Sequence, residues 1–304
     1  MTPAAAGAEL RLATYAMGTR FELVIPGDES EQFRPAAEAA MEEIETAHRL
    51  FTPFEPDSWL NHLHRVAADR PVAVDADTFA LFVDALAVWR ASEGAFDPTV
   101  APVLEAWGFH PAHGPSRGRF TSWAGAILLD PATRTIGFGR KGLRLDFGGI
   151  AKGHALDLAA RGLREHGVSA AFLHGGTSSA VGLGAPAGEA GWRVSLGPEH
   201  QAPVVVLHDS AVAVSGTLGR SAELGGRVFS HLIDPQAGRP LEGRGARRAA
   251  VVGCSARLAD AWSTALLVLG AVPPSFPDDW LAWLGHEAGG WAAAPGPWSP
   301  VPDP

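Results

Sequence analysis

The sequence lacks several features that would place it in a specialised class of protein. It holds one cysteine, Cys254, in 304 residues, which excludes an intramolecular disulfide and a cysteine metal site. Cys254 lies in an apolar, strand-like run, so we expect a buried, inert thiol rather than a nucleophile. No run of eighteen apolar residues occurs, and no transmembrane helix is therefore expected.

Clustered positive charge is also scarce. The formal net charge is −9, and the only basic cluster is Arg244, Arg247 and Arg248. Nucleic-acid binding needs clustered Lys and Arg to neutralise phosphates, so we expect no nucleic-acid partner. The opening residues MTPAAAGAELRL have neither a basic stretch nor a long apolar one, and so do not form a secretory signal. We expect a cytoplasmic protein, or a periplasmic or exported one if the N-terminus was trimmed.

The most informative stretch is Leu145 to Asp157, which reads LDFGGIAKGHALD. Glycine lets a backbone approach an anionic group closely, and a helix that starts after such a turn points free N–H groups at the anion. Lys152 adds a positive charge at the same place. The spacing differs from that of a P-loop and of a dinucleotide-binding Rossmann unit. Taken alone, the stretch fits either a phosphate site or a plain turn before a helix.

The hydrophobic pattern predicts an α+β protein whose sheets are rich in antiparallel strands with helices packed on them. The chain is expected to form a single compact unit over residues 1–304, with a loose tail at 295–304. The predicted helices cover 35–51, 76–94, a segment from 152 to 167 and 256–270. The predicted strands are two segments between 10 and 25 and the ranges 71–74, 127–129, 135–138, 143–147, 168–174, 192–196, 204–207, 211–214, 229–233, 249–254 and 280–284.

Two aspartates, Asp260 and Asp97, are candidates for ligand binding. Asp260 lies four residues before Thr264, so both side chains project from one face of an otherwise apolar helix. Burying an unpaired charge is costly, and Mg²⁺ prefers such oxygen ligands; an ordinary hydrogen bond is the alternative. Asp97 precedes a proline, which keeps it out of the α region and on a rigid loop. It either caps the following turn or binds a ligand.

Histidines and loop aromatics give weaker signals. His110 and His113 are three residues apart in a loop-rich region, but there is no third ligand nearby, so we expect a solvated loop. His231 alternates with Leu232 in a strand pattern, and a lone histidine of this kind is usually structural. The Pro-broken segment FTPFEPDSW is expected to place Phe54 and Trp59 in a non-regular loop.

Seven short motifs occur in a fixed order along the chain. They are Met17-Gly18-Thr19, Phe96-Asp97-Pro98-Thr99-Val100, LDFGGIAKGHALD, the Gly175-Gly176 turn, Ser215-Gly216, His231-Leu232-Ile233-Asp234-Pro235 and the segment from Asp260 to Thr264. Their joint order and spacing resemble the ApbE family of FAD:protein FMN transferases. The resemblance extends over about residues 14–270.

The resemblance implies a T-fold-like α+β architecture, FAD as substrate and a bound Mg²⁺ ion. It places the cation on the side chains of Asp260 and Thr264 and on the backbone carbonyl of Gly149. It places His231 beside the pyrophosphate. It assigns the FAD contacts to Met17, Phe54, Ala95, Phe96, Asp97, Asp146, Lys152, Ser215 and Leu232.

The implied reaction transfers the FMN part of FAD to a Thr or Ser hydroxyl of an acceptor protein and releases AMP. Phosphoryl-type displacements depend mainly on positioning and charge neutralisation, which Mg²⁺ and Lys152 would supply. His231 would accept the proton of the hydroxyl, while Asp260 would hold the metal. Two alternatives remain open: Mg²⁺-dependent hydrolysis of FAD to FMN and AMP, and a non-catalytic flavin-binding protein.

The chain departs from the usual family pattern at three places. Phe54 stands where the family usually has tyrosine, so a hydrogen bond from that ring would be absent. His64 lies near the family's asparagine position, with Asn61 displaced from it. His174 precedes the second Gly-Gly turn, where asparagine is more usual. These departures concern the FAD contacts and leave the metal and phosphate motifs intact.

Overall fold

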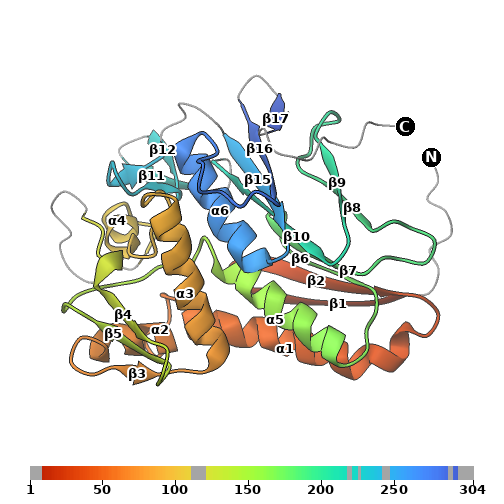
Figure 1. Cartoon of the computed structure of the whole chain (residues 1–304), viewed down its shortest axis with the longest axis horizontal. Coiled ribbons are helices and arrows are strands. Elements are labelled where there is room, and N and C mark those ends of the chain that lie inside the picture. Colours follow the sequence, from red (N-terminus) through yellow and green to blue (C-terminus); the bar gives the residue numbers. More distant parts are fainter. Residues whose placement is uncertain are drawn as a thin grey trace.

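An eight-stranded antiparallel sheet forms the centre of the molecule in the computed structural model (Figure 1). The structure describes residues 9–110, 121–217, 221–224, 227–241, 247–286 and 290–293. In spatial order the strands are β1 (Glu9–Ala16), β2 (Thr19–Pro26), β6 (Ala171–Gly175), β7 (Ser179–Leu183), β10 (Ser210–Gly216), β15 (Arg248–Gly253), β16 (Leu281–Gly285) and β17 (Trp291–Ala293).

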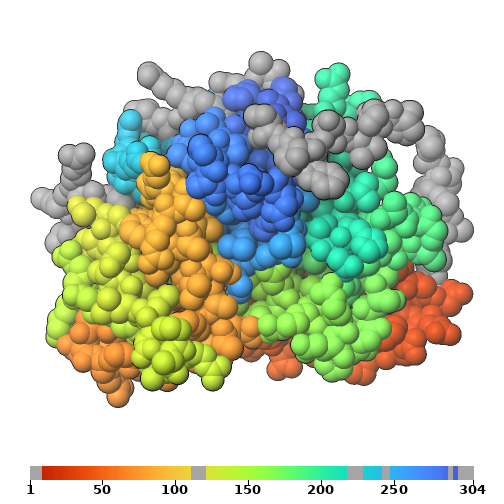
Figure 2. Space-filling model, viewed as in Figure 1, coloured from red at the N-terminus to blue at the C-terminus, as the bar shows by residue number. Residues whose placement is uncertain are grey.

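Helices cover one face of this sheet and a hairpin covers part of the other. Helix α1 (Arg34–Phe51) packs on β1 and on α5 (Ala151–Glu165), and α6 (Ala256–Leu269) packs on β10 and β15. Helix α3 (Ala76–Ala91) packs on α6, and Figure 2 shows α3, α5 and α6 side by side on one surface. The opposite face of the sheet packs against β8 (Trp192–Ser195) and β9 (Val204–Leu207) in a second apolar cluster.

A smaller layer lies beyond α3 (Figure 1). It contains α2 (Trp59–Val66), α4 (Ala101–Ala106) and a three-stranded sheet of β3 (Val72–Ala73), β5 (Thr135–Phe138) and β4 (Ile127–Asp130). Two ribbons complete it, β11 (Ser221–Leu224) with β12 (Arg227–Ser230), and β13 (Ile233–Asp234) with β14 (Arg239–Pro240). Short 3₁₀ turns occur at η1 (Ser30–Phe33) and η2 (Ala124–Ala126).

A half-buried aspartate in the middle of α5 ties this helix to the start of α6. Asp157 of α5 accepts hydrogen bonds from the backbone N–H of Ala256 at 2.8 Å and of Arg257 at 3.0 Å, and from the Ser255 hydroxyl at 2.8 Å. Ser255 in turn caps α6 by accepting from Leu258 N at 3.3 Å. These bonds satisfy N–H groups that the first turn of a helix leaves unpaired. The side chains of α6 are thereby fixed over the start of α5.

Most predicted elements are confirmed, including the turn at Met17-Gly18, the Asp75 and Ser255 caps and the antiparallel sheet. Helices α2 and α4 and strand β7 were not predicted, and Trp59 begins α2 rather than lying in a loop. The predicted strand at 143–147 is wrong, because these residues pair with no strand.

Two placements of single residues were also wrong. His231 lies in a bend between β12 and β13 rather than within a strand. Cys254 is exposed rather than buried, because β15 ends at Gly253 and the chain turns toward α6. Arg244, His113 and the tail at 295–304 lie outside the described residues. Within the described residues, none of the helices combines the length and apolarity needed to cross a membrane.

Candidate functional site

Asp260 and Lys152 form the centre of the candidate site. Asp260 is 3 % exposed in α6, and Lys152 lies in the first turn of α5. The Lys152 Nζ is 3.3 Å from Oδ2 and 3.4 Å from Oδ1 of Asp260. The backbone N–H of Gly153 donates to Oδ2 at 3.2 Å, and the Ser179 hydroxyl lies 3.5 Å from Oδ1. The buried carboxylate is therefore balanced by an ammonium group and two further donors.

Hydroxyl and carbonyl oxygens gather on the same face of α6. Ser263 Oγ donates to the Asp260 carbonyl at 2.9 Å, and Thr264 Oγ1 does so at 3.2 Å. Ser215, near the end of β10, brings its Oγ to 2.8 Å from Ser263 Oγ and 3.2 Å from Thr264 Oγ1. Ser215, which the family resemblance assigns to FAD binding, therefore contacts Ser263 and Thr264 directly.

Gly149 lies against this oxygen cluster. A Cβ at Gly149 would be 3.0 Å from Thr264 Oγ1 and 3.3 Å from Phe96 Cε2, so a side chain there would be crowded. In a regular helix Gly153 N–H would donate to the Gly149 carbonyl, but it donates to Asp260 instead. No hydrogen-bond donor to the Gly149 carbonyl is found among the described residues. Gly149, Asp260 and Thr264 therefore present carbonyl, carboxylate and hydroxyl oxygens, which suit Mg²⁺.

Asp146 contacts His110 and the backbone of the glycine turn. Its Oδ2 is 3.1 Å from His110 Nε2, and its Oδ1 accepts from Gly148 N at 2.9 Å. Burial acts to raise the pKa of Asp146, but the His110 hydrogen bond and charge, the Gly148 N–H and the charge of His231 together hold that pKa below its usual range. The carboxylate is therefore ionised at neutral pH. The prediction of a solvated loop at His110 is wrong, since its side chain is only 9 % exposed.

The loop between α3 and α4 carries three of the predicted FAD contacts. Ala95, Phe96 and Asp97 are all buried. Asp97 Oδ1 accepts from the Thr99 backbone N–H at 2.7 Å and from its hydroxyl at 2.6 Å, so the capping alternative holds for this oxygen. Asp97 Oδ2 is buried without a hydrogen-bond partner in the part of the chain that the structure describes. A buried acceptor of this kind is costly, and it fits the hydroxyl groups of a nucleotide.

Met17 and Leu232, two further residues at which the family resemblance places FAD, lie on other segments of the chain. Met17 has a φ of 50°, a left-handed conformation that is uncommon outside glycine and is often held at functional sites. Its N–H donates to His48 Nδ1 at 3.3 Å. Leu232 N–H donates to Ser230 Oγ at 3.2 Å, next to His231. Among the described residues, neither Met17 nor Leu232 is hydrogen bonded to Asp260, Lys152 or Asp146.

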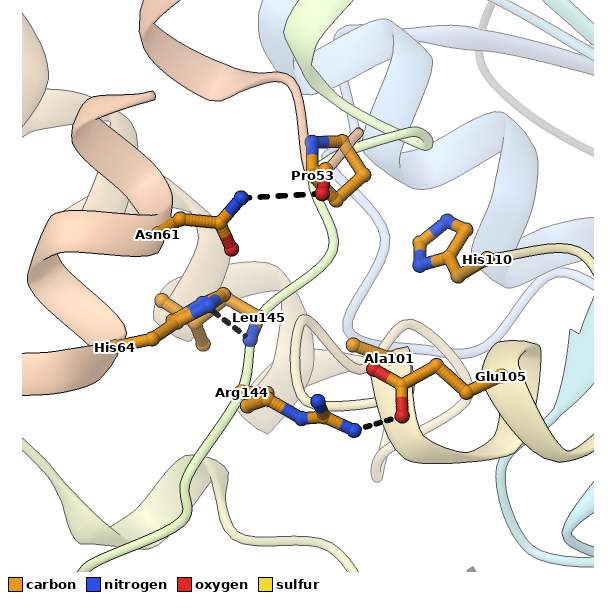
Figure 3. Close-up of a pocket in the computed structure, with 8 residues that line it drawn as sticks. All are labelled: Pro53, Asn61, His64, Ala101, Glu105, His110, Arg144 and Leu145. Atoms are coloured by element: carbon orange, nitrogen blue, oxygen red, sulfur yellow. Dashed lines mark hydrogen bonds and ion pairs between the residues drawn. The ribbon is translucent and has the colours of Figure 1, made fainter. Parts of the chain in front are cut away.

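Side chains from α2 and α4 hold the segment that leads into the glycine turn (Figure 3). His64 Nε2 accepts from Leu145 N at 2.9 Å, and Arg144 forms an ion pair with buried Glu105. With the contact between Asp146 and His110, these interactions fix the three consecutive residues Arg144, Leu145 and Asp146. Arg144 and Leu145 border a small pocket of about 10 Å³ that opens to solvent, lined by Pro53, Asn61, His64, Ala101, Glu105, His110, Arg144 and Leu145.

The departures from the family pattern have structural roles here. The Asn61 amide donates to the carbonyls of Pro53 at 3.1 Å and Glu55 at 2.8 Å, which fixes the backbone around Phe54. His174 Nε2 is 3.2 Å from Glu22 Oε2, and its Nδ1 is 3.0 Å from the Gly176 carbonyl. The sequence pattern identifies His64 and His174 only as departures, and no local signal predicts the Glu105–Arg144 pair because these residues are far apart in the chain.

The sequence profile of the ApbE family matches residues 17–289. FAD:protein FMN transferase of Rhodobacter capsulatus is 32 % identical over 268 residues, covering 84 % of this chain and 50 % of the relative. The proteins of the same name from Treponema pallidum (strain Nichols) and Escherichia coli (strain K12) are 32 % and 27 % identical, covering 78 % and 84 % of this chain and 74 % and 76 % of the relatives.

Solved structures agree with the sequence relatives. The ApbE protein from Thermotoga maritima superposes with a TM-score of 0.81 at 25 % identity, covering 94 % of this chain and 97 % of that one. The flavin transferase ApbE from Vibrio cholerae gives 0.75 at 22 % identity, with the same coverage. The chain belongs to the ApbE family, and the predicted α+β fold is confirmed. It spans half the length of the Rhodobacter relative and about three quarters of the other two.

Proposed function

We propose that the chain catalyses Mg²⁺-dependent transfer of the FMN part of FAD to a Thr or Ser hydroxyl of an acceptor protein, with release of AMP. The observation that carries this proposal is the meeting of Lys152, Asp260, Thr264 and Gly149 where α5 begins beneath α6. The relatives named FAD:protein FMN transferase support the same chemistry.

The start of α5 suits the pyrophosphate of FAD. The N-terminus of a helix carries a partial positive charge, which favours phosphate, although in α5 the N–H groups of Ala151 and Gly153 already donate to the Phe147 carbonyl and to Asp260. Lys152 places a full charge in the first turn of this helix. Gly148 and Gly149 precede the helix, and the absence of side chains allows the phosphates to approach the backbone. These features support a phosphate-holding role for LDFGGIAKGHALD over a plain turn before a helix.

Asp260, Thr264 and Gly149 are the residues that would hold Mg²⁺. When bound, the ion neutralises phosphate oxygens and stabilises the charge that develops as the phosphate ester exchanges. Lys152 bridges the two halves of the site, because its ammonium contacts Asp260 from the first turn of α5. The ammonium group of Lys152 is thus a positive charge that the protein itself supplies to the nucleotide site.

The remaining chemistry, the transfer of the hydroxyl proton, falls to His231. The acceptor hydroxyl attacks the phosphorus of the FMN phosphate, a new O–P bond forms, the pyrophosphate P–O bond breaks, and AMP leaves. His231 takes the proton of the hydroxyl and returns it to solvent. The ionised Asp146 is close enough for the charge of His231 to lower its pKa.

The test is an incubation with FAD, MgCl₂ and a threonine-bearing flavin-acceptor domain, followed by intact-mass measurement. We expect the acceptor to gain one FMN unit, and its Thr→Ala variant to gain none. Free FMN and AMP beside an unmodified acceptor would replace transfer with FAD hydrolysis. Unchanged FAD bound to the protein would instead identify a flavin-binding protein.

A further inference from the structure

His110 has two contacts within the candidate nucleotide site. It follows α4, and its side chain is 9 % exposed. Nε2 lies 3.1 Å from Asp146 Oδ2, and the imidazole packs edge-on against the Phe54 ring, with centroids 5.3 Å apart and planes at 73°. Both partners are residues at which the family resemblance places FAD. His110 belongs to none of the seven motifs that carry that resemblance.

His110 contributes to the placement of the Phe54 ring. Its side chain is 45 % exposed, and a phenyl ring has no hydroxyl with which to anchor itself. The Asn61 amide fixes the backbone on either side through the Pro53 and Glu55 carbonyls. The ring itself is held in an edge-on pair by His110.

We propose that His110 is a positioning residue of the nucleotide site, which holds the Asp146 carboxylate and the Phe54 ring in one fixed arrangement that receives FAD. The identity of the ligand rests on the proposed function. The two contacts use different parts of the imidazole: Nε2–H donates to the carboxylate, and the ring packs on Phe54. His110 lines the small pocket on the side opposite Asn61 and His64 (Figure 3).

This role separates binding from turnover. Among the described residues, no hydrogen bond or ring contact joins His110 to Lys152, Asp260 or Thr264. Loss of the imidazole should therefore weaken the binding of FAD while the groups around the pyrophosphate stay in place. The expected signature is a higher Kd and KM for FAD with little change in kcat.

Two substitutions divide the contacts of His110. His110→Gln keeps an N–H donor near the position of Nε2 and loses the ring, whereas His110→Phe keeps a ring against Phe54 and loses the donor. His62→Ala, on an exposed position of α2, is the control. The Kd for FAD is measured by flavin fluorescence in EDTA, KM and kcat by flavin transfer in MgCl₂, and Tm by calorimetry.

We expect His110→Phe to raise Kd and KM about tenfold with kcat within about twofold. His110→Gln should recover part of that loss, and His62→Ala should match the wild type. Unchanged Kd and KM in both His110 variants would overturn the proposal, as would a loss that follows Tm alone. A wild type that binds FAD but transfers no flavin would refute the proposed function and leave the Kd comparison decisive. A wild type that does not bind FAD would overturn both.

Discussion

At the scale of single residues, the charge of Asp260 is the feature on which the site most depends. The carboxylate is almost fully buried and accepts hydrogen bonds from the Lys152 ammonium, the Gly153 N–H and the Ser179 hydroxyl. Asp260→Asn keeps the size and one acceptor oxygen but removes the charge. We expect flavin transfer to fall about a hundredfold or more, because preorganised charge at such a site has an effect of that size, and activation by Mg²⁺ to be lost.

The measurement is the initial rate of flavin transfer against MgCl₂ concentration. Asp77→Asn is a suitable control, because it removes a carboxylate that pairs with Arg161 on the surface at 2.6 Å, where ion pairs contribute only about 0–1 kcal/mol. Full activity of Asp260→Asn at ordinary Mg²⁺ concentrations would refute the assignment of Asp260 to the metal.

Asp97 allows capping and ligand binding to be tested separately. In Asp97→Asn the amide oxygen can still accept from Thr99 N and Oγ1, so the turn should persist. The buried Oδ2 becomes an NH₂ group, which cannot accept a hydroxyl hydrogen. We expect Tm to change by only a few degrees and the Kd for FAD to rise about tenfold. An unchanged Kd, measured by fluorescence titration, would leave Asp97 with a capping role alone.

Sequence reasoning succeeded where the relevant spacing is local. Asp260 and Thr264 are one helical turn apart, and the four-residue interval was sufficient to place them on one face. It failed for His110, which was expected in solvent and is mostly buried, and for Cys254, which was expected in the core and is exposed. Exposure of these two residues is decided by where the chain turns after α4 and β15, and no local pattern specifies that.

At the scale of elements, the contact between α5 and α6 is set by one glycine. A Cβ at Gly153 would lie 2.1 Å from the Ala256 carbonyl oxygen, whereas a Cβ at Gly162 in the same helix would meet nothing within 4 Å. Gly153→Ala should therefore separate the two helices and lower the free energy of unfolding by about 3 kcal/mol. Gly162→Ala should raise it by about 0.5–1 kcal/mol, because alanine favours helix.

Urea unfolding of both alanine variants measures this difference. Gly153→Ala should also reduce flavin transfer, because it shifts the N–H that donates to Asp260, while Gly162→Ala should retain activity. Equal stability of the two variants would show that α5 and α6 tolerate a larger separation than the structure implies.

The longer elements were predictable and the shorter ones were not. Helices α1, α3 and α6 have repeated apolar positions, and α3 and α6 also have side-chain caps. Helices α2 and α4 are only 8 and 6 residues long and lie among prolines. Their signals were the Ser58 cap and the early proline of α4. The segment at 143–147 has the composition of a strand, but its backbone bonds to His64 and Pro98 instead of to a neighbouring strand.

At the scale of the whole molecule, the order of strands could not be read from the sequence. β2 pairs with β6, which follows it by more than a hundred residues, and β10 pairs with both β7 and β15. Such pairings depend on which apolar faces meet in three dimensions rather than on local pattern. They matter for function because they bring Ser179 and Ser215, on neighbouring strands, beneath α6.

His154 connects the stability of the whole molecule to pH. It lies in α5 at 2 % exposure, its Nδ1 is 3.2 Å from Arg257 Nη1, and its ring packs against Phe51. Burial and the Arg257 charge lower the pKa of His154 from 6.5 to about 4, although Asp77 and Asp75 act in the opposite direction.

Between pH 6.5 and about 4, the unfolded chain therefore binds a proton that the folded protein does not. The free energy of unfolding should fall as pH drops through this window, by up to about 3 kcal/mol from this group. His154→Asn, which keeps an acceptor for Arg257 without a titrating ring, should flatten that slope in urea unfolding measured across the window. Acid also protonates Asp146 and Asp77, whose pKa values are lowered. Their protonation should lower the free energy of unfolding of the wild type and of His154→Asn equally. Identical pH slopes for the two proteins would show that His154 titrates normally in the folded state.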